Sequence, residues 1–297
     1  MFDFRLKVFY TVAKRLNFTK AAEELFISQP AVTKHIREIE SHYNIRLFDR
    51  NGTKIKLTDT GRTLLQYCDE IFSVYNRLEF ELNNNSSQHK GIIRIGASTT
   101  IADYILPPVL ASFHKKFKDV KIILLINNTE FIEQALTDNN IDLGIIEGYS
   151  KKSIFKYTEF VKDELVLVKS TGSNLIQTDI TKSELPTIPL LLREPGSGTL
   201  DVIAHALKSK NIRLSELNIE MQLGSTESIK LYLPNSDTMA FLSVYAIINE
   251  LKRNELSIVD IEGFSIERNL YFIQKHGEGN SLPDLFMDFA SRYNFGL

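Results

Sequence analysis

This sequence has little cysteine and a small net charge. Its 297 residues include one cysteine, Cys68, and carry a net charge of −2. A single cysteine excludes an intrachain disulfide and fits a reducing cytoplasm. No apolar run approaches the roughly 20 residues that span a bilayer. The first 18 residues interleave charges with apolar residues, unlike a signal peptide. We therefore expect a cytoplasmic, globular chain of two or three domains.

The motifs of common enzyme sites are also missing. The sequence has no GxxxxGK[ST], no GxSxG and no HExxH, and its "PGSGT" lacks the spacing of a dinucleotide fingerprint. Its six histidines are scattered, at positions 35, 42, 89, 114, 205 and 276. We therefore expect no catalytic residues, no metal site and no cofactor.

The charge that is present is unevenly placed. Residues 1–66 hold 12 basic and 7 acidic side chains, a net charge of +5, whereas the remainder carries −7. A basic end on an acidic body allows contact with nucleic acid at that end, although chance unevenness would look the same.

Three helices are expected in the basic segment. Helical spacing predicts the first over residues 4–16 and the second over residues 20–26, with Thr19 as its cap. Ser28 is a suitable cap for a third helix that ends near Glu40, and Pro30 suits its first turn.

The third helix has two different sides. Val32, Ile36 and Ile39 form an apolar side. The opposite side carries groups that can bond phosphates and base edges: Ser28, Gln29, Pro30, Thr33, Lys34 and Arg37. Two short helices joined by a tight turn match the helix-turn-helix geometry. This pattern alone fits a solvated amphipathic helix equally well.

A small basic β-hairpin is expected next. Asn51-Gly52 is a strong hairpin signal, and the following residues alternate basic with apolar side chains up to Leu57. Three residues of this wing are placed to reach a DNA backbone: Arg50, Thr53 and Lys54.

A long helix capped by Thr58 is expected to follow the wing. Apolar residues recur along it at steps of 4, 3, 4, 3 and 4: Leu64, Cys68, Ile71, Tyr75, Leu78 and Leu82. This heptad seam predicts pairing with the same helix of a second chain, although packing against the chain's own core is an alternative. Cys68 is interpreted as a small buried residue rather than a cross-dimer disulfide. The polar residues 83–91 then form a linker.

Strands and helices alternate from Ile92 onward, which predicts α/β sheets with helices on both faces. The strands are expected at 92–96, 121–127, 142–147, 164–169, 188–193, 218–223, 238–242, 256–259 and 268–274. The helices are expected near 101–117, 130–138, 199–210, 226–233, 244–253 and 282–294.

Four turns where strands pass into helices carry hydroxyl groups. A helix N-terminus with hydroxyls and free backbone N–H groups suits a small anion, and such turns meet at the carboxyl ends of parallel strands. Each turn alone is better explained as a helix cap, but together they favour a pocket. Its candidate residues are Ser98, Thr99, Thr100, Thr129, Arg193, Ser197, Gly198, Thr199 and Thr226.

The first 65 residues also resemble a known family. "FYTVAKRLNFTKAAEELFISQPAVTKHIREIE" followed by "IRLFDRNGTKIKLTDTG" is similar to the winged helix-turn-helix of LysR-type transcriptional regulators. The resemblance implies a mainly α winged helix-turn-helix domain over 1–58 and a linker and dimerisation helix over 59–90. It implies a C-terminal α/β effector domain over 91–297, similar to type 2 periplasmic binding proteins. Lobe one of that domain would be 91–162 plus 266–297, and lobe two 163–265.

The resemblance implies a sequence-specific regulator that binds double-stranded DNA. We expect Ser28, Gln29, Thr33 and Arg37 to enter the major groove, and Lys34, Arg50 and Lys54 to touch phosphates mainly. The implied assembly is a homodimer, with tetramers usual in the family, and RNA polymerase is a further partner. The competing hypothesis is a small-molecule binding protein or transferase whose N-terminal helices only dimerise.

The resemblance also narrows the range of candidate effectors. "REPGSGT" resembles the branch of the family linked to sulfur assimilation and carbon fixation. It implies an anionic metabolite, with sulfate, thiosulfate, O-acetylserine and phosphorylated metabolites as candidates. The arginine that usually follows "GSGT" is Leu200 here, which removes one expected charge contact.

Overall fold

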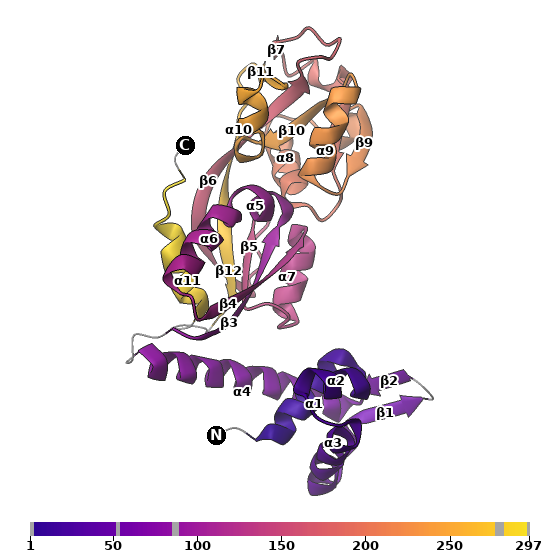
Figure 1. The fold of residues 1–297 in the computed structure, drawn as a ribbon. Helices are drawn as coiled ribbons and strands as arrows, with labels where there is room; N and C mark the ends of the chain where they lie inside the picture. Colours follow the sequence, from indigo (N-terminus) through magenta and orange to yellow (C-terminus); the bar gives the residue numbers. More distant parts are fainter. Residues whose placement is uncertain (1–2, 52–53, 85–88, 277–281, 296–297) are drawn as a thin grey trace. The chain divides into compact units, whose positions relative to one another are not determined.

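A computed structural model describes residues 3–51, 54–84, 89–276 and 282–295. The chain divides into a first unit, residues 1–79, and a second unit, residues 80–297 (Figure 1). Within the described ranges, no helix has the length and apolar character needed to cross a membrane.

The first unit begins with three short helices, as predicted: α1 (Phe4–Arg15), α2 (Phe18–Leu25) and α3 (Gln29–Tyr43). The expected cap of the second helix was wrong. The side chain of Asn17, not Thr19, accepts two backbone N–H groups of the first turn, so α2 begins earlier than predicted. An amide oxygen one residue before the helix is better placed for this than a hydroxyl inside the first turn.

The third helix starts as predicted and ends later. The hydroxyl of Ser28 accepts the N–H of Ala31 at 3.3 Å, and Pro30 lies in the first turn. The helix continues past the predicted end at Glu40 to Tyr43, where Asn44 adopts a left-handed conformation with φ of 51°. Asparagine tolerates this conformation and is a common residue after a helix end.

The wing is an antiparallel hairpin of β1 (Phe48–Asn51) and β2 (Lys54–Leu57), as predicted, with Phe48 opposite Leu57. Thr53 lies outside the described residues, as do the side chains of Arg50 and Lys54. The wing packs on the helices through the buried ring of Phe48, which lies 5.5 Å from that of Phe9. This aromatic contact holds the hairpin against α1.

The long helix α4 (Asp59–Asn84) is capped as predicted, because the hydroxyl of Thr58 accepts the N–H of Gly61 at 2.9 Å. Two residues of the predicted dimer seam lie elsewhere. Leu64 and Cys68 pack into the core of the first unit, and Cys68 is fully buried there. Burial raises the pKa of the Cys68 thiol to about 12, so the thiol stays protonated.

Two other residues of the predicted seam, Ile71 and Leu78, are exposed and belong to a stripe shared with Tyr67 and Val74. Its apolar members recur at steps of 4, 3 and 4, and each is at least 40% exposed: Tyr67, Ile71, Val74 and Leu78. Tyr75 of the predicted seam is half-buried, and the side chain of Leu82 lies outside the described part. The heptad periodicity is therefore real, but the stripe that remains free is shifted from the predicted one.

The second unit contains α/β layers, as expected (Figure 1). Its strands are β3 (Gly91–Ser98), β4 (Val120–Asn127), β5 (Leu143–Ile146), β6 (Phe155–Ser170), β7 (Asp179–Ile180), β8 (Leu190–Arg193), β9 (Ile219–Leu223), β10 (Met239–Ser243), β11 (Leu256–Ile261) and β12 (Ile266–Lys275). Its α-helices are α5 (Thr99–Tyr104), α6 (Leu106–Lys116), α7 (Thr129–Thr137), α8 (Gly198–Ser209), α9 (Thr226–Tyr232), α10 (Val244–Lys252) and α11 (Leu282–Ser291).

Two of these elements differ most from the sequence prediction, and β7 was not predicted. The helix expected over 101–117 is two helices that meet at Ile105, because Pro107 and Pro108 begin a new helix. The strand expected over 164–169 begins nine residues earlier, at Phe155. The additional residues pair with residues 268–275 of β12.

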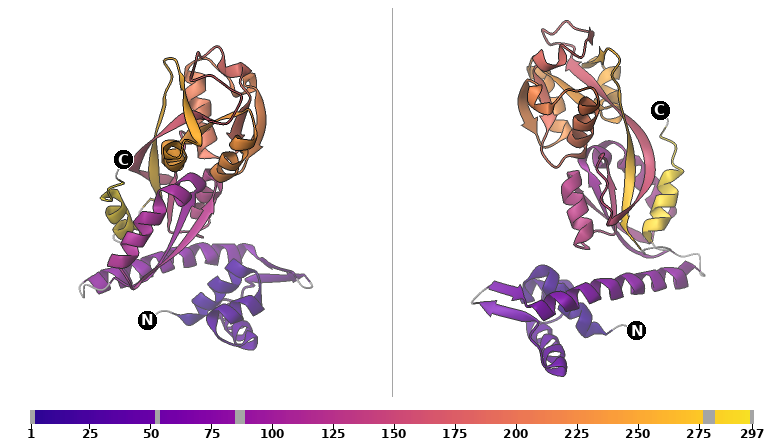
Figure 2. Two further views of the ribbon diagram at one scale, coloured as in Figure 1. Left: turned by 45° about the horizontal axis from the view of Figure 1, so that its top comes forward. Right: turned by 180° about the vertical axis from the view of Figure 1, so that it is seen from behind.

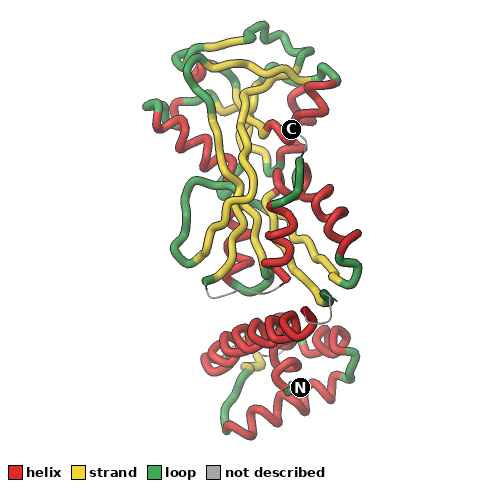
Figure 3. The backbone as a smooth tube through the Cα atoms, turned by 90° about the vertical axis from the view of Figure 1, so that its left-hand side faces the viewer, coloured by secondary structure: helices red, strands yellow, loops and turns green. Residues whose placement is uncertain are grey.

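The strand order is β4-β3-β5-β12-β6-β10-β8-β9. Parallel strands β4, β3 and β5 lie on one side, which we call the β3 half, and β10, β8 and β9 lie on the other, the β8 half. The antiparallel pair β6 and β12 joins them, and the two strands run side by side through the unit (Figures 2 and 3). The two halves have separate hydrophobic clusters, one around Phe113 and Phe286 and the other around Leu190 and Ile203.

Candidate functional site

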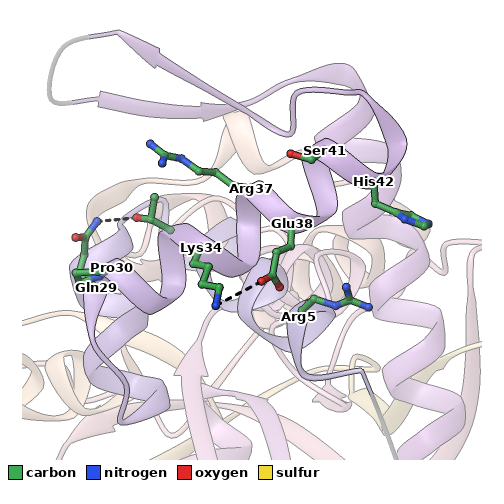
Figure 4. A pocket seen from close by; sticks show the side chains of 9 residues that line it. Arg5, Gln29, Pro30, Lys34, Arg37, Glu38, Ser41 and His42 are labelled. Atoms are coloured by element: carbon green, nitrogen blue, oxygen red, sulfur yellow. Dashed lines mark hydrogen bonds and ion pairs between the residues drawn. The ribbon is translucent and has the colours of Figure 1, made fainter.

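The exposed side of α3 lines a groove on the first unit (Figure 4). Val32, Ile36 and Ile39 are buried against the other helices, which confirms the predicted apolar side. The predicted polar side faces the groove through Gln29, Pro30, Thr33, Lys34 and Arg37. Capping by Ser28 holds the N-terminal turn of this helix in place.

The side chains in this groove differ in the hydrogen bonds and ion pairs that they make. Gln29 donates to the hydroxyl of Thr33 at 3.0 Å, and Lys34 lies 4.0 Å from the carboxylate of Glu38. Figure 4 shows Arg37 extending away from these contacts, without an ion pair to the other residues drawn. A guanidinium held by no carboxylate keeps its donors available for the bidentate contacts that arginine makes with guanine.

Sequence reasoning missed four residues of the groove: Arg5, Glu38, Ser41 and His42. Ser41 continues the spacing of Arg37 by four residues, and only the early predicted end of the helix hid it. Arg5 lies on α1, where it pairs with Asp3 at 2.7 Å. Nothing in its sequence context indicated that α1 reaches this face.

The structure brings four predicted effector residues together in the second unit, around a residue that was not predicted. The hydroxyls of Ser98 and Thr199 donate to the carboxylate of Glu147, the latter at 3.1 Å. Thr129 donates to the Glu147 backbone carbonyl at 2.9 Å. Gly198 lies so close that a Cβ there would clash with the same carbonyl oxygen. Glu147 is only 1% exposed.

Two other predicted residues meet across the halves. The hydroxyls of Thr100 and Thr226 are 3.2 Å apart, with Thr100 on α5 of the β3 half and Thr226 on α9 of the β8 half. The buried guanidinium of Arg193 reaches the turn before α9, where it donates to the carbonyl of Gly224 at 3.4 Å. It also pairs with Glu194 at 2.8 Å.

Three of the predicted residues retain buried donor groups without a partner among the described residues: Nη1 of Arg193, Oγ of Ser197 and Oγ1 of Thr99. Arg193 and Ser197 are 2% and 4% exposed. Buried polar groups are nearly always hydrogen-bonded, so each orphaned donor requires an explanation such as a ligand or an ordered water.

A buried ion pair adjoins Glu147. Arg268 on β12 and Asp163 on β6 approach within 2.7 Å, and their side chains are 2% and 0% exposed. Ser243 donates to Asp163 at 2.8 Å, and Arg268 donates to the hydroxyl of Thr199 at 2.9 Å. The arginine expected at position 200 is therefore absent, and a guanidinium from a distant strand contacts the neighbouring residue instead.

A cavity of about 1050 Å³ opens beside this ion pair. Its lining carries three cationic and three anionic side chains: Lys151, Lys162, Arg268, Asp163, Glu164 and Glu267. The balanced charges of this lining do not favour an anion, whereas the orphaned donors of Thr99, Arg193 and Ser197 do. Among the residues that the structure describes, no group of three or more His, Cys, Asp or Glu side chains could hold a metal ion.

Family models match both units of the chain. The family model described as "Bacterial regulatory helix-turn-helix protein, lysR family" matches residues 4–62. The model described as "LysR substrate binding domain" matches residues 86–293. The HTH-type transcriptional regulator CysL of Bacillus subtilis (strain 168) is 32% identical over 269 residues, covering 90% of this chain and 89% of the relative.

Two solved structures share the fold. The regulatory domain of CcmR from Synechocystis PCC6803, solved in complex with 2-PG, is 26% identical, with a TM-score of 0.61. The match covers 68% of this chain and 96% of that domain. Full-length CbnR, solved with its target DNA, is 18% identical with a TM-score of 0.64, over 98% of this chain and 99% of CbnR. The latter likeness concerns the fold alone.

Proposed function

Because the chain belongs to the LysR family, we propose that its α3 face reads DNA and that an anion bound between the β3 and β8 halves controls it. Membership of this family makes the chain a DNA-binding transcriptional regulator with an effector-binding domain, and not the transferase of the competing hypothesis. The assignment of residues to DNA, the effector chemistry and the site are the proposal. We propose the cytoplasm as its place of action.

The observation that supports DNA reading is the guanidinium of Arg37 in the groove of α3, which has no ion pair among the residues that the structure describes. Thr33 and Gln29 lie on the same side, one and two turns earlier, and Lys34 adds a charge that suits a phosphate. We assign Arg37, Gln29 and Thr33 to base edges and Lys34 to phosphates. Arg5 extends this surface from α1 and is assigned to the DNA backbone.

Replacing Arg37 with alanine should weaken binding to the natural operator by about 1–3 kcal/mol and relax the sequence preference. Lys34→Ala should weaken natural and scrambled DNA alike. Fluorescence anisotropy on both DNAs at several salt concentrations measures the two effects. Arg213→Ala, in the second unit, controls for the loss of one positive charge. Equal weakening of both DNAs by Arg37→Ala would remove its base-reading role.

The observation that supports an anionic effector is the set of three orphaned donors on Thr99, Arg193 and Ser197. Thr99 opens α5 in the β3 half, whereas Arg193 and Ser197 belong to the β8 half. An acceptor-rich anion would satisfy donors from both halves at once, which favours one relative orientation of the halves over another.

Thr99→Val combined with Ser197→Ala should abolish the response to the effector while leaving DNA binding unchanged. Each hydrogen bond to a charged ligand contributes about 1.5–3 kcal/mol. The measurement is a thermal-shift screen of sulfate, thiosulfate, O-acetylserine and sugar phosphates, in which a ligand at 100 times its Kd stabilises by about 2.7 kcal/mol. Ser209→Ala, at the other end of α8, is the matched control. An unchanged shift in the double variant would refute this site.

We further propose that the exposed stripe of Tyr67, Ile71, Val74 and Leu78 pairs two chains, so that two α3 helices read a dyad-related operator. Higher assembly to a tetramer and contact with RNA polymerase belong to the same proposal. They are tested by the mass of the DNA-bound complex and by transcription in vitro.

A further inference from the structure

Glu147 lies where the hydroxyl groups of the predicted anion site converge. The residue follows β5 in the β3 half and is almost completely buried. Its carboxylate accepts from Ser98, at the end of β3, and from Thr199, in the first turn of α8. The contacts come from both halves of the unit, so this carboxylate holds the position that a bound oxyanion would take.

The two hydroxyls have nothing left to donate. A hydroxyl carries one hydrogen, and Ser98 and Thr199 each direct theirs to Glu147. The oxygen of Thr199 also accepts from Nη1 of Arg268 at 2.9 Å. That guanidinium is in turn paired with Asp163. The two side-chain hydroxyls therefore offer no proton to an incoming oxyanion, which would also meet the negative charge of Glu147 within hydrogen-bonding range.

We propose that Glu147 determines which anions the effector site accepts. The inference rests on the proposed function, in which the effector is an anion bound by Thr99, Arg193 and Ser197. By filling the hydroxyl cradle of Ser98 and Thr199, Glu147 excludes compact inorganic oxyanions from it. The anionic group of the effector is confined to the orphaned donors, and any part that approaches Glu147 is uncharged or donates a hydrogen bond. The effector is therefore an organic molecule with its negative charge at one end.

Glu147→Gln tests this inference, because glutamine keeps the shape and removes the charge. Its amide oxygen still accepts from one hydroxyl, while its NH₂ group releases the proton of the other for a ligand. We expect the full-length variant to bind inorganic sulfate and phosphate at least about tenfold more tightly than the natural protein at constant ionic strength. Isothermal titration calorimetry measures this gain. An affinity within about threefold of the natural protein's would overturn the proposal.

Glu133→Gln is the matched control. Glu133 is also a buried glutamate of the β3 half, but it pairs with Lys152 at 2.7 Å and does not contact the cradle. It should gain no affinity for sulfate or phosphate. An equal gain in this variant would mean that lost negative charge in general, and not Glu147, governs the affinity, and would also overturn the proposal.

Glu147→Met gives a second test if the glutamine variant folds poorly. Methionine fills similar space and leaves both hydroxyls free, so sulfate affinity should rise here too, and adding Ser98→Ala should reverse the gain. Urea unfolding followed by circular dichroism reports whether the second unit of each variant is folded. If Thr99→Val with Ser197→Ala leaves effector binding intact, the proposed site is wrong. If Glu147→Gln and Glu147→Met gain nothing, this inference alone is wrong.

Discussion

Replacing Ile71 and Leu78 with aspartate will halve the mass of the protein in solution and weaken its binding to a dyad operator by about 100-fold to 10,000-fold. Both side chains are exposed on α4, at 40% and 48%, within the stripe that also includes Tyr67 and Val74. Two charges in a helix–helix seam would be buried without partners, which dissociates the pair. Each DNA-binding unit would then meet its half-site alone.

Light scattering gives the mass, and anisotropy with dyad DNA gives the affinity. The control is Gln66→Asp, which adds a negative charge at an exposed position of α4 outside the stripe. If the Ile71/Leu78 variant keeps its mass and its dyad affinity, this stripe does not pair two chains.

Arg268→Ala will destabilise the second unit by about 3–5 kcal/mol. The change leaves the carboxylate of Asp163 fully buried without its cation, and removes the donor to Thr199. Removing one partner of a buried ion pair costs more than the pair itself contributes, because the remaining charge stays desolvated. The pair joins β6 to β12, the two strands that connect the β3 and β8 halves.

Urea unfolding of the full chain, followed by circular dichroism, measures this loss. The transition of the first unit, which the substitution does not touch, is the internal reference. The double variant Asp163→Asn with Arg268→Met removes both charges and should recover part of the stability, since no unpaired charge remains. A cost below about 1 kcal/mol for Arg268→Ala would show that this pair does not stabilise the unit.

The helices of the first unit could be predicted because their signals are local. Ser28 caps α3, and its apolar residues return every three or four positions, so both the start and the buried side follow from the sequence. The dimer stripe could not be fixed in the same way. Helix α4 carries two adjacent apolar stripes, and Cys68 belongs to the one that packs on residues of α1 and α3. That choice depends on partners far away in the sequence.

Only part of the effector site could be predicted, because some of its residues have local signals and others depend on distant partners. Turns rich in hydroxyls are recognisable in the sequence, and the structure brings Ser98, Thr129 and Thr199 together. Glu147 has no local signature, because it follows a short buried strand that reads only as an apolar run. Its importance arises from α8, some fifty residues later, which places Thr199 against its carboxylate.

One measurement tests the central claim that a ligand in the second unit controls DNA binding by the first. DNA from upstream of the protein's own gene is footprinted with the full chain, with and without a saturating amount of the anion found in the thermal-shift screen. We predict protection of two half-sites related by a dyad, and a protected region that changes when the anion is added. No protection, or protection that stays identical while the anion is bound, would contradict the account.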